Sequence, residues 1–261
     1  MWPYPKIIAH RGAGLLAPEN TLAALRHAVT HGYQGVEFDV MLAADDVPVL
    51  MHDEHFGRTV PGIGRVADTT AAQLAAMDAG SWLGAQFAGE PVPRFDAAAR
   101  FCRVAGLWMN VEIKPAAGVE AHTGAVVARL VRSLFADDLR RAAEGATQGA
   151  VPPCVPLLSS FSQAALHTAR EVAPELALGC LVDDMPDDWQ QRCTAVGATA
   201  LHMNQAHVTP AIAAVVRGAG FGLFCYTVND APRAAQLLQW GVDGFCTDRP
   251  DLIGPGAGSA A

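Results

Sequence analysis

Charged residues are scarce in this chain of 261 residues, where they make up 17% of the sequence against 51% for hydrophobic residues. An average soluble protein carries about 25% charged residues. Disordered proteins combine low hydrophobicity with high charge density, so the composition excludes a disordered chain. The length matches one large domain or two small ones, and α/β barrels often fill about 250 residues as a single unit.

Basic residues are fewer than acidic ones, since 18 Lys and Arg stand against 26 Asp and Glu and leave a net charge of -8. Nucleic-acid-binding proteins usually carry a basic face, so we expect no nucleic-acid partner. The same charge disfavours binding to anionic membranes, and we expect no membrane partner. An anionic substrate would need a local source of positive charge.

Signals for metal-binding cysteines, secretion and membrane insertion are missing. The six cysteines form no C-x-x-C pair and show no spacing with histidine that is typical of zinc sites. The first residues lack the basic and apolar regions of a signal peptide. No apolar run approaches the roughly 20 residues needed to cross a bilayer. We therefore expect a reduced, cytoplasmic protein with a buried core.

Short apolar runs alternate with alanine-rich helical patterns along most of the chain. The predicted strands are 7–10, 36–40, 47–52, 107–113, 157–160, 177–182, 200–203, 222–228 and 244–247. The predicted helices include 20–32, 121–135, 162–172, 210–218 and 231–241. Repeated strand–helix units indicate a parallel sheet covered by helices. Eight such units predict one α/β domain over residues 1–253, a closed (β/α)8 TIM barrel.

One predicted strand, 47–52, is an extra member of this series. Only a short polar turn separates it from the strand before, and a parallel crossover needs about a dozen residues, so it must return as a β-hairpin. A symmetric turn centred on Asp45 and Asp46 would place Asp39 directly opposite His52.

Two segments do not follow the barrel rhythm. Residues 53–105 are rich in turn signals and contain one short predicted helix near 70–77, so we expect a small insertion above the barrel mouth. The Gly- and Ala-rich tail at 254–261 has no apolar anchor, and we expect it to be disordered.

Acidic side chains collect on two predicted strands, and barrel enzymes place their sites where strands end. Residues two apart on a strand share a face, which joins Glu37 to Asp39 and Glu112 to Lys114. Burying three carboxylates together would raise their pKa values. A hard divalent ion removes this conflict, so we expect Glu37, Asp39 and Glu112 to bind Mg²⁺ or Ca²⁺, with Mn²⁺ also possible. The alternative is a salt-bridge network with Arg11 and Lys114.

Two histidines and two cations flank this acidic cluster. His10 and His52 can supply a general base and a general acid near neutral pH. Arg11 offers bidentate donors to a phosphate group, and Lys114 offers a point charge. Together with a metal ion, these residues indicate metal-assisted displacement at a phosphate ester.

Ten short motifs follow one another in a fixed order along the chain. They are HRG at 10–12, APENT at 17–21, EFD at 37–39, HD at 52–53, RVA at 65–67, DAGSW at 78–82, NVEIK at 110–114, SSF at 159–161, YTVN at 226–229 and TDR at 247–249. In this order the sequence resembles the glycerophosphodiester phosphodiesterase family of the bacterial cytoplasmic type. The resemblance implies a (β/α)8 barrel with an insertion after the second histidine. It also implies hydrolysis of glycerophosphodiesters, such as glycerophosphocholine or glycerophosphoethanolamine, to glycerol 3-phosphate and an alcohol.

The resemblance also assigns roles to residues of this chain. It makes His10 and His52 catalytic, assigns metal binding to Glu37, Asp39 and Glu112, and assigns phosphate contacts to Arg11 and Lys114. We assign His10 as the base and His52 as the acid. The nucleophile is either water or the substrate's own 2-hydroxyl.

Aromatic and late-strand residues give further candidates. Phe161 and Tyr226 are expected to form an apolar wall beside the substrate, with plain core packing as the alternative; Tyr226 stands where many relatives carry Trp. Asn229 and Asp248 are weaker candidates at late strand ends, since Asp248 can also pair locally with Arg249.

Other functions use parts of the same constellation. Another phosphodiesterase or a phospholipase on the same barrel is one alternative, although a phospholipase would need a membrane-facing surface. A non-catalytic phosphate-binding barrel would lack one of the histidines or carboxylates, and none is missing. A metal-dependent sugar isomerase would not need Arg11 and Lys114 beside the metal.

Overall fold

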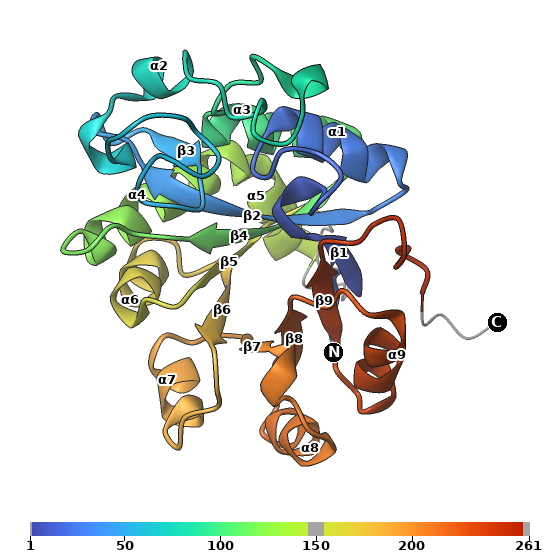
Figure 1. The fold of residues 1–261 in the computed structure, drawn as a ribbon. Coiled ribbons are helices and arrows are strands. Elements are labelled where there is room, and N and C mark those ends of the chain that lie inside the picture. The colour runs from blue at the N-terminus through green and yellow to red at the C-terminus, as the bar shows by residue number, and fades with distance from the viewer. Residues whose placement is uncertain (1, 146–153, 258–261) are drawn as a thin grey trace.

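Eight parallel strands close into a barrel in the computed structural model, which describes residues 2–145 and 154–257 (Figure 1). The strands are β1 (Ile7–Ala9), β2 (Gly35–Leu42), β4 (Trp108–Ile113), β5 (Leu157–Ser160), β6 (Ala177–Val182), β7 (Ala200–Asn204), β8 (Gly222–Tyr226) and β9 (Gly244–Thr247). Each strand pairs with the next in this series, and β9 pairs with β1 to close the ring. The predicted (β/α)8 TIM barrel is therefore confirmed.

Helices cover the outside of the barrel (Figure 1). They are α1 (Leu22–Thr30), α3 (Phe95–Ala105), α4 (Glu120–Leu134), α5 (Ala136–Gly145), α6 (Gln163–Val172), α7 (Trp189–Ala195), α8 (Pro210–Gly218) and α9 (Ala231–Gln239). Side-chain oxygens cap several of them; the Thr21 hydroxyl, for example, accepts a hydrogen bond from the Ala24 N–H at the start of α1. The main core lies between sheet and helices, as where Phe38 of β2 packs on Phe95 of α3 with ring centroids 6.0 Å apart.

The predicted hairpin forms between β2 and β3 (Pro48–Leu50). β1 meets β2 at one Cα pair only, Ala9 with Val36, and β3 pairs antiparallel with β2 farther along, at Val40–Leu42. Because β1 ends at Ala9, the C-terminal part of β2 on this edge is free to pair with β3.

The predicted register of this hairpin is wrong by one residue. Val40 lies opposite Leu50, and the Met51 N–H donates to the Asp39 carbonyl at 3.2 Å, so Met51 rather than His52 faces Asp39. The turn is asymmetric because Asp46 adopts a left-handed conformation with φ 59°. A three-residue loop ending in such a residue is a common hairpin connection and shifts the register.

The segment expected to be an insertion is shorter than 53–105, because its last part is a barrel helix. Phe95, Ala98 and Cys102 of α3 are buried in the main core. Their spacing is helical, but the many turn signals before them obscured it.

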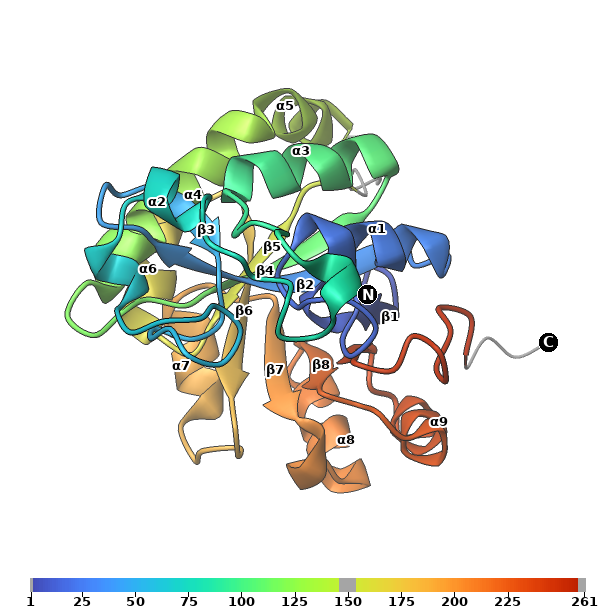
Figure 2. The ribbon, with the colours of Figure 1, turned by 45° about the horizontal axis from the view of Figure 1, so that its top comes forward.

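The remaining part of the insertion gathers around β3 with a small core of its own (Figure 2). It includes α2 (Ala71–Leu74), whose Leu74 is buried with Met51, Val60 and Val66. This arrangement places the insertion beside the end of β2 that carries Asp39.

The structure describes the first part, residues 254–257, of the tail that is predicted to be disordered. Residues 254–257 form a turn in which the Ala257 N–H donates to the Gly254 carbonyl at 3.0 Å. The rest of the predicted disordered tail, 258–261, lies outside the described residues. Among 2–145 and 154–257, every helix is too short or too polar to span a bilayer.

Candidate active site

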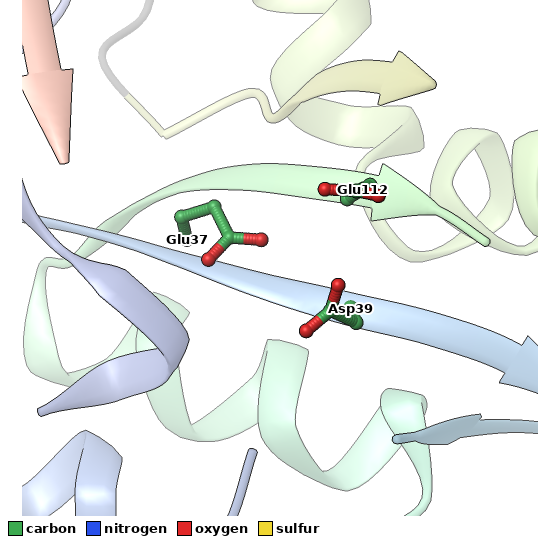
Figure 3. Close-up of side chains that lie close together, drawn as sticks. All are labelled: Glu37, Asp39 and Glu112. Atoms are coloured by element: carbon green, nitrogen blue, oxygen red, sulfur yellow. The ribbon is translucent and has the colours of Figure 1, made fainter. Parts of the chain in front are cut away.

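Three carboxylates meet at the C-terminal end of β2 and β4 (Figure 3). The two strands pair with Asp39 opposite Glu112, and Glu37 lies two residues before Asp39 on the same face. One oxygen of each carboxylate lies within 4.8 Å of the others. The Glu37 and Asp39 side chains are 5% and 2% exposed, so water screens their mutual repulsion poorly.

The pKa values show the strain in this cluster. Burial and the charge of Asp39 raise the pKa of Glu37 to about 7 and that of Glu112 to about 8. Burial also opposes ionisation of Asp39, but Lys114 and Arg11 outweigh it and hold its pKa at about 2. Glu37 Oε1 is buried without a hydrogen-bond partner among the described residues. Carboxylate oxygens in this state fit a hard divalent cation.

His10 follows β1 in a single 3₁₀ turn, His10–Gly12. Its Nδ1 atom lies 2.6 Å from Asp248 Oδ1, and its Nε2 atom lies 3.6 Å from Glu37 Oε2. Burial lowers the pKa of His10, but the hydrogen bond to Asp248 and the charge of Glu37 raise it by more. The Asn229 side chain holds Asp248 by donating to Oδ2 at 2.9 Å and accepting from its N–H at 2.7 Å.

Asp248 is therefore part of the site, and the alternative of a local ion pair with Arg249 is wrong. Arg249 instead pairs with Asp251 at 2.8 Å.

His52 has the same kind of carboxylate partner. Its Nδ1 atom lies 2.6 Å from Asp53 Oδ1. Burial, Arg11 and Lys114 lower the pKa of His52 by more than Asp39 and Asp53 raise it. A carboxylate at Nδ1 fixes the orientation of the ring. In each histidine, Nε2 is therefore the nitrogen that remains available to another partner.

The two cations lie against the acidic cluster. The Arg11 N–H donates to Glu37 Oε2 at 3.0 Å, and its guanidinium Nε lies 3.4 Å from Asp39 Oδ2. Arg11 Nη1 donates to Glu19 Oε1 at 2.9 Å. Lys114 Nζ lies 3.3 Å from Asp39 Oδ1. Asp39 is thus shared by both cations, which brings positive charge to the mouth of an acidic protein.

A cavity of about 220 Å³ opens beside these groups. Its polar wall includes His10, Arg11, Glu37, His52, Asn110, Glu112 and Lys114, and its apolar wall includes Phe161, Leu181, Phe224 and Tyr226. Phe161 and Tyr226 meet edge to face with centroids 5.9 Å apart. The Tyr226 hydroxyl donates to the Val182 carbonyl at 2.8 Å, so it is the ring that faces the cavity. The cavity therefore suits a ligand with one anionic and one less polar part.

A larger cavity of about 1010 Å³ lies at the other end of the barrel, beside Trp2, Ala177 and Gly222 at the start of strands. Barrel enzymes use the C-terminal ends of their strands, where the carboxylates and histidines lie. The smaller cavity is therefore the candidate active site.

Comparison with known proteins agrees with this geometry. The model of the glycerophosphoryl diester phosphodiesterase family matches residues 10–252. The chain belongs to this family. It is 29% identical over 248 residues to the glycerophosphodiester phosphodiesterase of Caldanaerobacter subterraneus subsp. tengcongensis, with 95% of each chain covered.

Solved structures give the same result. The chain is similar to a phosphodiesterase of Oleispira antarctica, which was solved in complex with the product sn-glycerol-3-phosphate. The TM-score is 0.84, the identity is 33%, and 95% of each chain is covered. It is also similar to a glycerophosphodiester phosphodiesterase of Agrobacterium tumefaciens, with a TM-score of 0.71, 27% identity and coverage of 95% of this chain and 97% of that one.

The structure brings the predicted site residues of the phosphodiesterase together. Eight of them line the cavity, namely His10, Arg11, Glu37, His52, Glu112, Lys114, Phe161 and Tyr226, and Asp39 completes the carboxylate cluster. Sequence reasoning missed the roles of Glu19 and Asn20, which lie within a motif, and of Arg58. Asn20 Nδ2 donates to Asp39 Oδ2 at 2.8 Å. Arg58 lies in a turn-rich segment with no periodic pattern, so no sequence signal marks it.

Proposed function

We propose that the protein hydrolyses glycerophosphodiesters, such as glycerophosphocholine or glycerophosphoethanolamine, to glycerol 3-phosphate and an alcohol. The observation that carries the proposal is one buried carboxylate cluster beside two histidines that each have a carboxylate at Nδ1. The similar Oleispira antarctica structure contains sn-glycerol-3-phosphate, which supports the same product here.

Glu37, Asp39 and Glu112 would hold one divalent ion, Mg²⁺ or Ca²⁺, with Mn²⁺ as a further option. When bound there, the ion supplies positive charge to a phosphate oxygen and lowers the pKa of a hydroxyl nucleophile. The oxygen-only donor set supports this assignment, and so does Glu37 Oε1, which has no hydrogen-bond partner within 2–145 and 154–257.

The histidines move the protons in this proposal. His10 is the general base. Its Nε2 atom lies 3.6 Å from Glu37 Oε2, and neutralising the charge of Glu37 there would lower the pKa that this charge raises and free the imidazole to accept a proton. His52 is the general acid and protonates the leaving alkoxide. The nucleophile is water or the 2-hydroxyl of the substrate.

The remaining lining residues bind and orient the substrate. Arg11 and Lys114 stabilise the developing charge on the phosphate. Phe161 and Tyr226 form the wall for the less polar part of the diester.

We propose a cytoplasmic location and no nucleic-acid or membrane partner. All six cysteines are free, which is typical of a reducing compartment. The net charge of -8 disfavours polyanionic surfaces and supports a small-molecule substrate.

The test is the release of glycerol 3-phosphate from several glycerophosphodiesters, with Mg²⁺, Ca²⁺ or Mn²⁺ and with a chelator. We expect release that the chelator abolishes. His10→Ala and His52→Ala should each lower turnover by about a hundredfold or more, with metal binding retained. His167→Ala, in an exposed pair on α6, is the matched control. No release under any of the three metals would overturn the proposal.

A second substrate tests the order of proton transfer. A p-nitrophenyl diester has a leaving group that needs no protonation, so it should restore much of the activity of His52→Ala and little of His10→Ala. Restoration of His10→Ala instead would reverse the two roles.

A further inference from the structure

Arg58 forms a bidentate ion pair with Glu19 across the mouth of the barrel. Arg58 Nη1 donates to Glu19 Oε2 and Nη2 donates to Glu19 Oε1, both at 2.7 Å. Arg58 belongs to the insertion, and Glu19 belongs to the loop between β1 and α1, 39 residues away. The pair therefore fixes two separate segments relative to each other.

The third donor of Arg58 reaches the carboxylate that holds His52. Arg58 Nε donates to Asp53 Oδ2 at 2.6 Å, and Asp53 Oδ1 lies 2.6 Å from His52 Nδ1. Arg58 thus leaves one oxygen of Asp53 for the histidine and occupies the other. Because the Arg58 guanidinium lies in this position, the Asp53 carboxylate cannot rotate without losing a charged hydrogen bond.

The network continues from Glu19 to the phosphate-binding side of the site. Glu19 Oε1 also accepts from Arg11 Nη1 at 2.9 Å, and Arg11 Nε lies 3.4 Å from Asp39 Oδ2. Glu19 is therefore shared between two arginines, one from the insertion and one beside the acidic cluster. Its side chain is only 11% exposed.

His52 needs such support because no strand ladder holds it. β3 ends at Leu50, and the chain then enters the insertion. An exposed single ion pair contributes little to stability, but a bidentate pair within a network of several charges is the exception. Here the same three donors of one guanidinium satisfy two carboxylates.

We propose that Arg58 is a positioning residue for His52. It acts through Asp53 on the orientation of the imidazole and, through Glu19, ties that histidine to Arg11. This inference rests on the proposed function, in which His52 transfers a proton.

The experiment compares Arg58→Ala, Asp53→Asn and the double variant in the glycerol 3-phosphate assay. We expect each single variant to lower kcat by about ten- to a hundredfold, because small displacements of a catalytic group have effects of this size. Arg58→Ala should cost much less kcat in the Asp53→Asn background than in the wild type, since Arg58 orients His52 through Asp53. Arg58→Lys keeps the charge but not the planar set of donors, so its kcat should fall between Arg58→Ala and the wild type.

Glu19→Gln and a control variant complete the comparison. Glu19→Gln should raise KM as well as lower kcat, because Arg11 also loses the carboxylate that accepts from its Nη1. Arg65→Ala is the matched control, since Arg65 pairs with Glu54 in the same insertion and is similarly exposed, at 41% against 45% for Arg58. Its kcat and KM should stay within about twofold of the wild type.

A measurement without substrate separates this inference from the proposed function. The downfield Nδ1–H proton signal of His52, assigned by its loss in His52→Gln, should disappear in Arg58→Ala and persist in Arg65→Ala. If the wild type releases no glycerol 3-phosphate but this pattern holds, the proposed function has failed and the positioning stands. Wild-type kcat in Arg58→Ala, an equal further loss in the Asp53→Asn background, or an unchanged signal would each overturn the inference.

Discussion

His10 Nδ1 and Asp248 Oδ1 lie 2.6 Å apart, although 238 residues separate them in the chain. The strands that carry them pair in parallel, with Ala9 of β1 opposite Thr247 of β9. His10 directly follows β1 and Asp248 directly follows β9, so the two residues lie side by side at the mouth of the barrel. The closure of the barrel therefore creates this pair.

Asp248→Asn should lower kcat for glycerophosphodiester hydrolysis by about a hundredfold or more. The amide cannot stabilise a charged imidazole and permits the wrong tautomer of His10. Asp251→Asn, which removes only an exposed partner of Arg249, should leave kcat within about twofold of the wild type. The measurement is the initial rate at saturating substrate, and equal rates for the two variants would contradict the role of Asp248.

Gly14→Ala should disturb the same pair through the backbone. Gly14 has φ 56°, and a Cβ atom there would lie 2.1 Å from Asp248 Cα. The Leu15 N–H also donates to the Asp248 carbonyl at 3.0 Å, so the loop and Asp248 must move together. We expect a lower melting temperature and a kcat reduced by about tenfold or more.

Gly32→Ala is the control for this effect. Gly32 has φ 75° and nothing within 4 Å of its would-be Cβ, so the variant measures backbone strain alone. That strain costs about 1–2 kcal/mol of unfolding free energy. If Gly14→Ala destabilises the protein no more than Gly32→Ala does and keeps its kcat, the close approach does not matter.

Glu112→Gln should abolish stabilisation by the metal while relieving strain in the metal-free protein. Folding raises the pKa of Glu112 from 4.5 to about 8, chiefly by burial. Ionising Glu112 in the folded protein therefore lowers the free energy of unfolding. This loss is absent below pH 4.5, grows as pH rises and is complete above about 8. At pH 8.5 without metal, the variant should melt at or above the temperature of the wild type.

Added Ca²⁺ or Mg²⁺ should raise the melting temperature of the wild type and of Glu171→Gln, an exposed control on α6, but not that of Glu112→Gln. The same metal-induced rise in Glu112→Gln would exclude this carboxylate as a ligand.

His202 should make the protein sensitive to acid. Burial lowers the pKa of His202 from 6.5 to about 3, and its Nε2 atom has no hydrogen-bond partner among the described residues. Between pH 6.5 and about 3 the unfolded chain therefore binds a proton that the folded chain does not, and stability falls as pH falls. His202→Gln should lose less stability between pH 7 and 5 than the wild type in urea unfolding, whereas His167→Gln should follow the wild type. Parallel pH profiles for His202→Gln and the wild type would contradict this account.

The local pattern of the sequence was sufficient for the barrel and for the two faces of its strands. Alternation along β2 and β4 already places Glu37, Asp39 and Glu112 on one side, because successive side chains of a strand point in opposite directions. Helix α3 was missed because its helical spacing follows a run of turn signals. The predicted hairpin register was wrong because the turn as a whole determines the left-handed conformation of Asp46.

The sequence by itself determined the barrel, its family motifs and the set of acidic, basic and imidazole groups, since these depend on spacing within single segments. Only the tertiary structure decided which groups meet. His10 meets Asp248 because the barrel closes between its first and last strands, and Asp53, the partner of His52, meets Arg58 through a loop without periodicity. Contacts of this kind depend on where whole segments lie in space, and the order of residues along one segment does not contain that information.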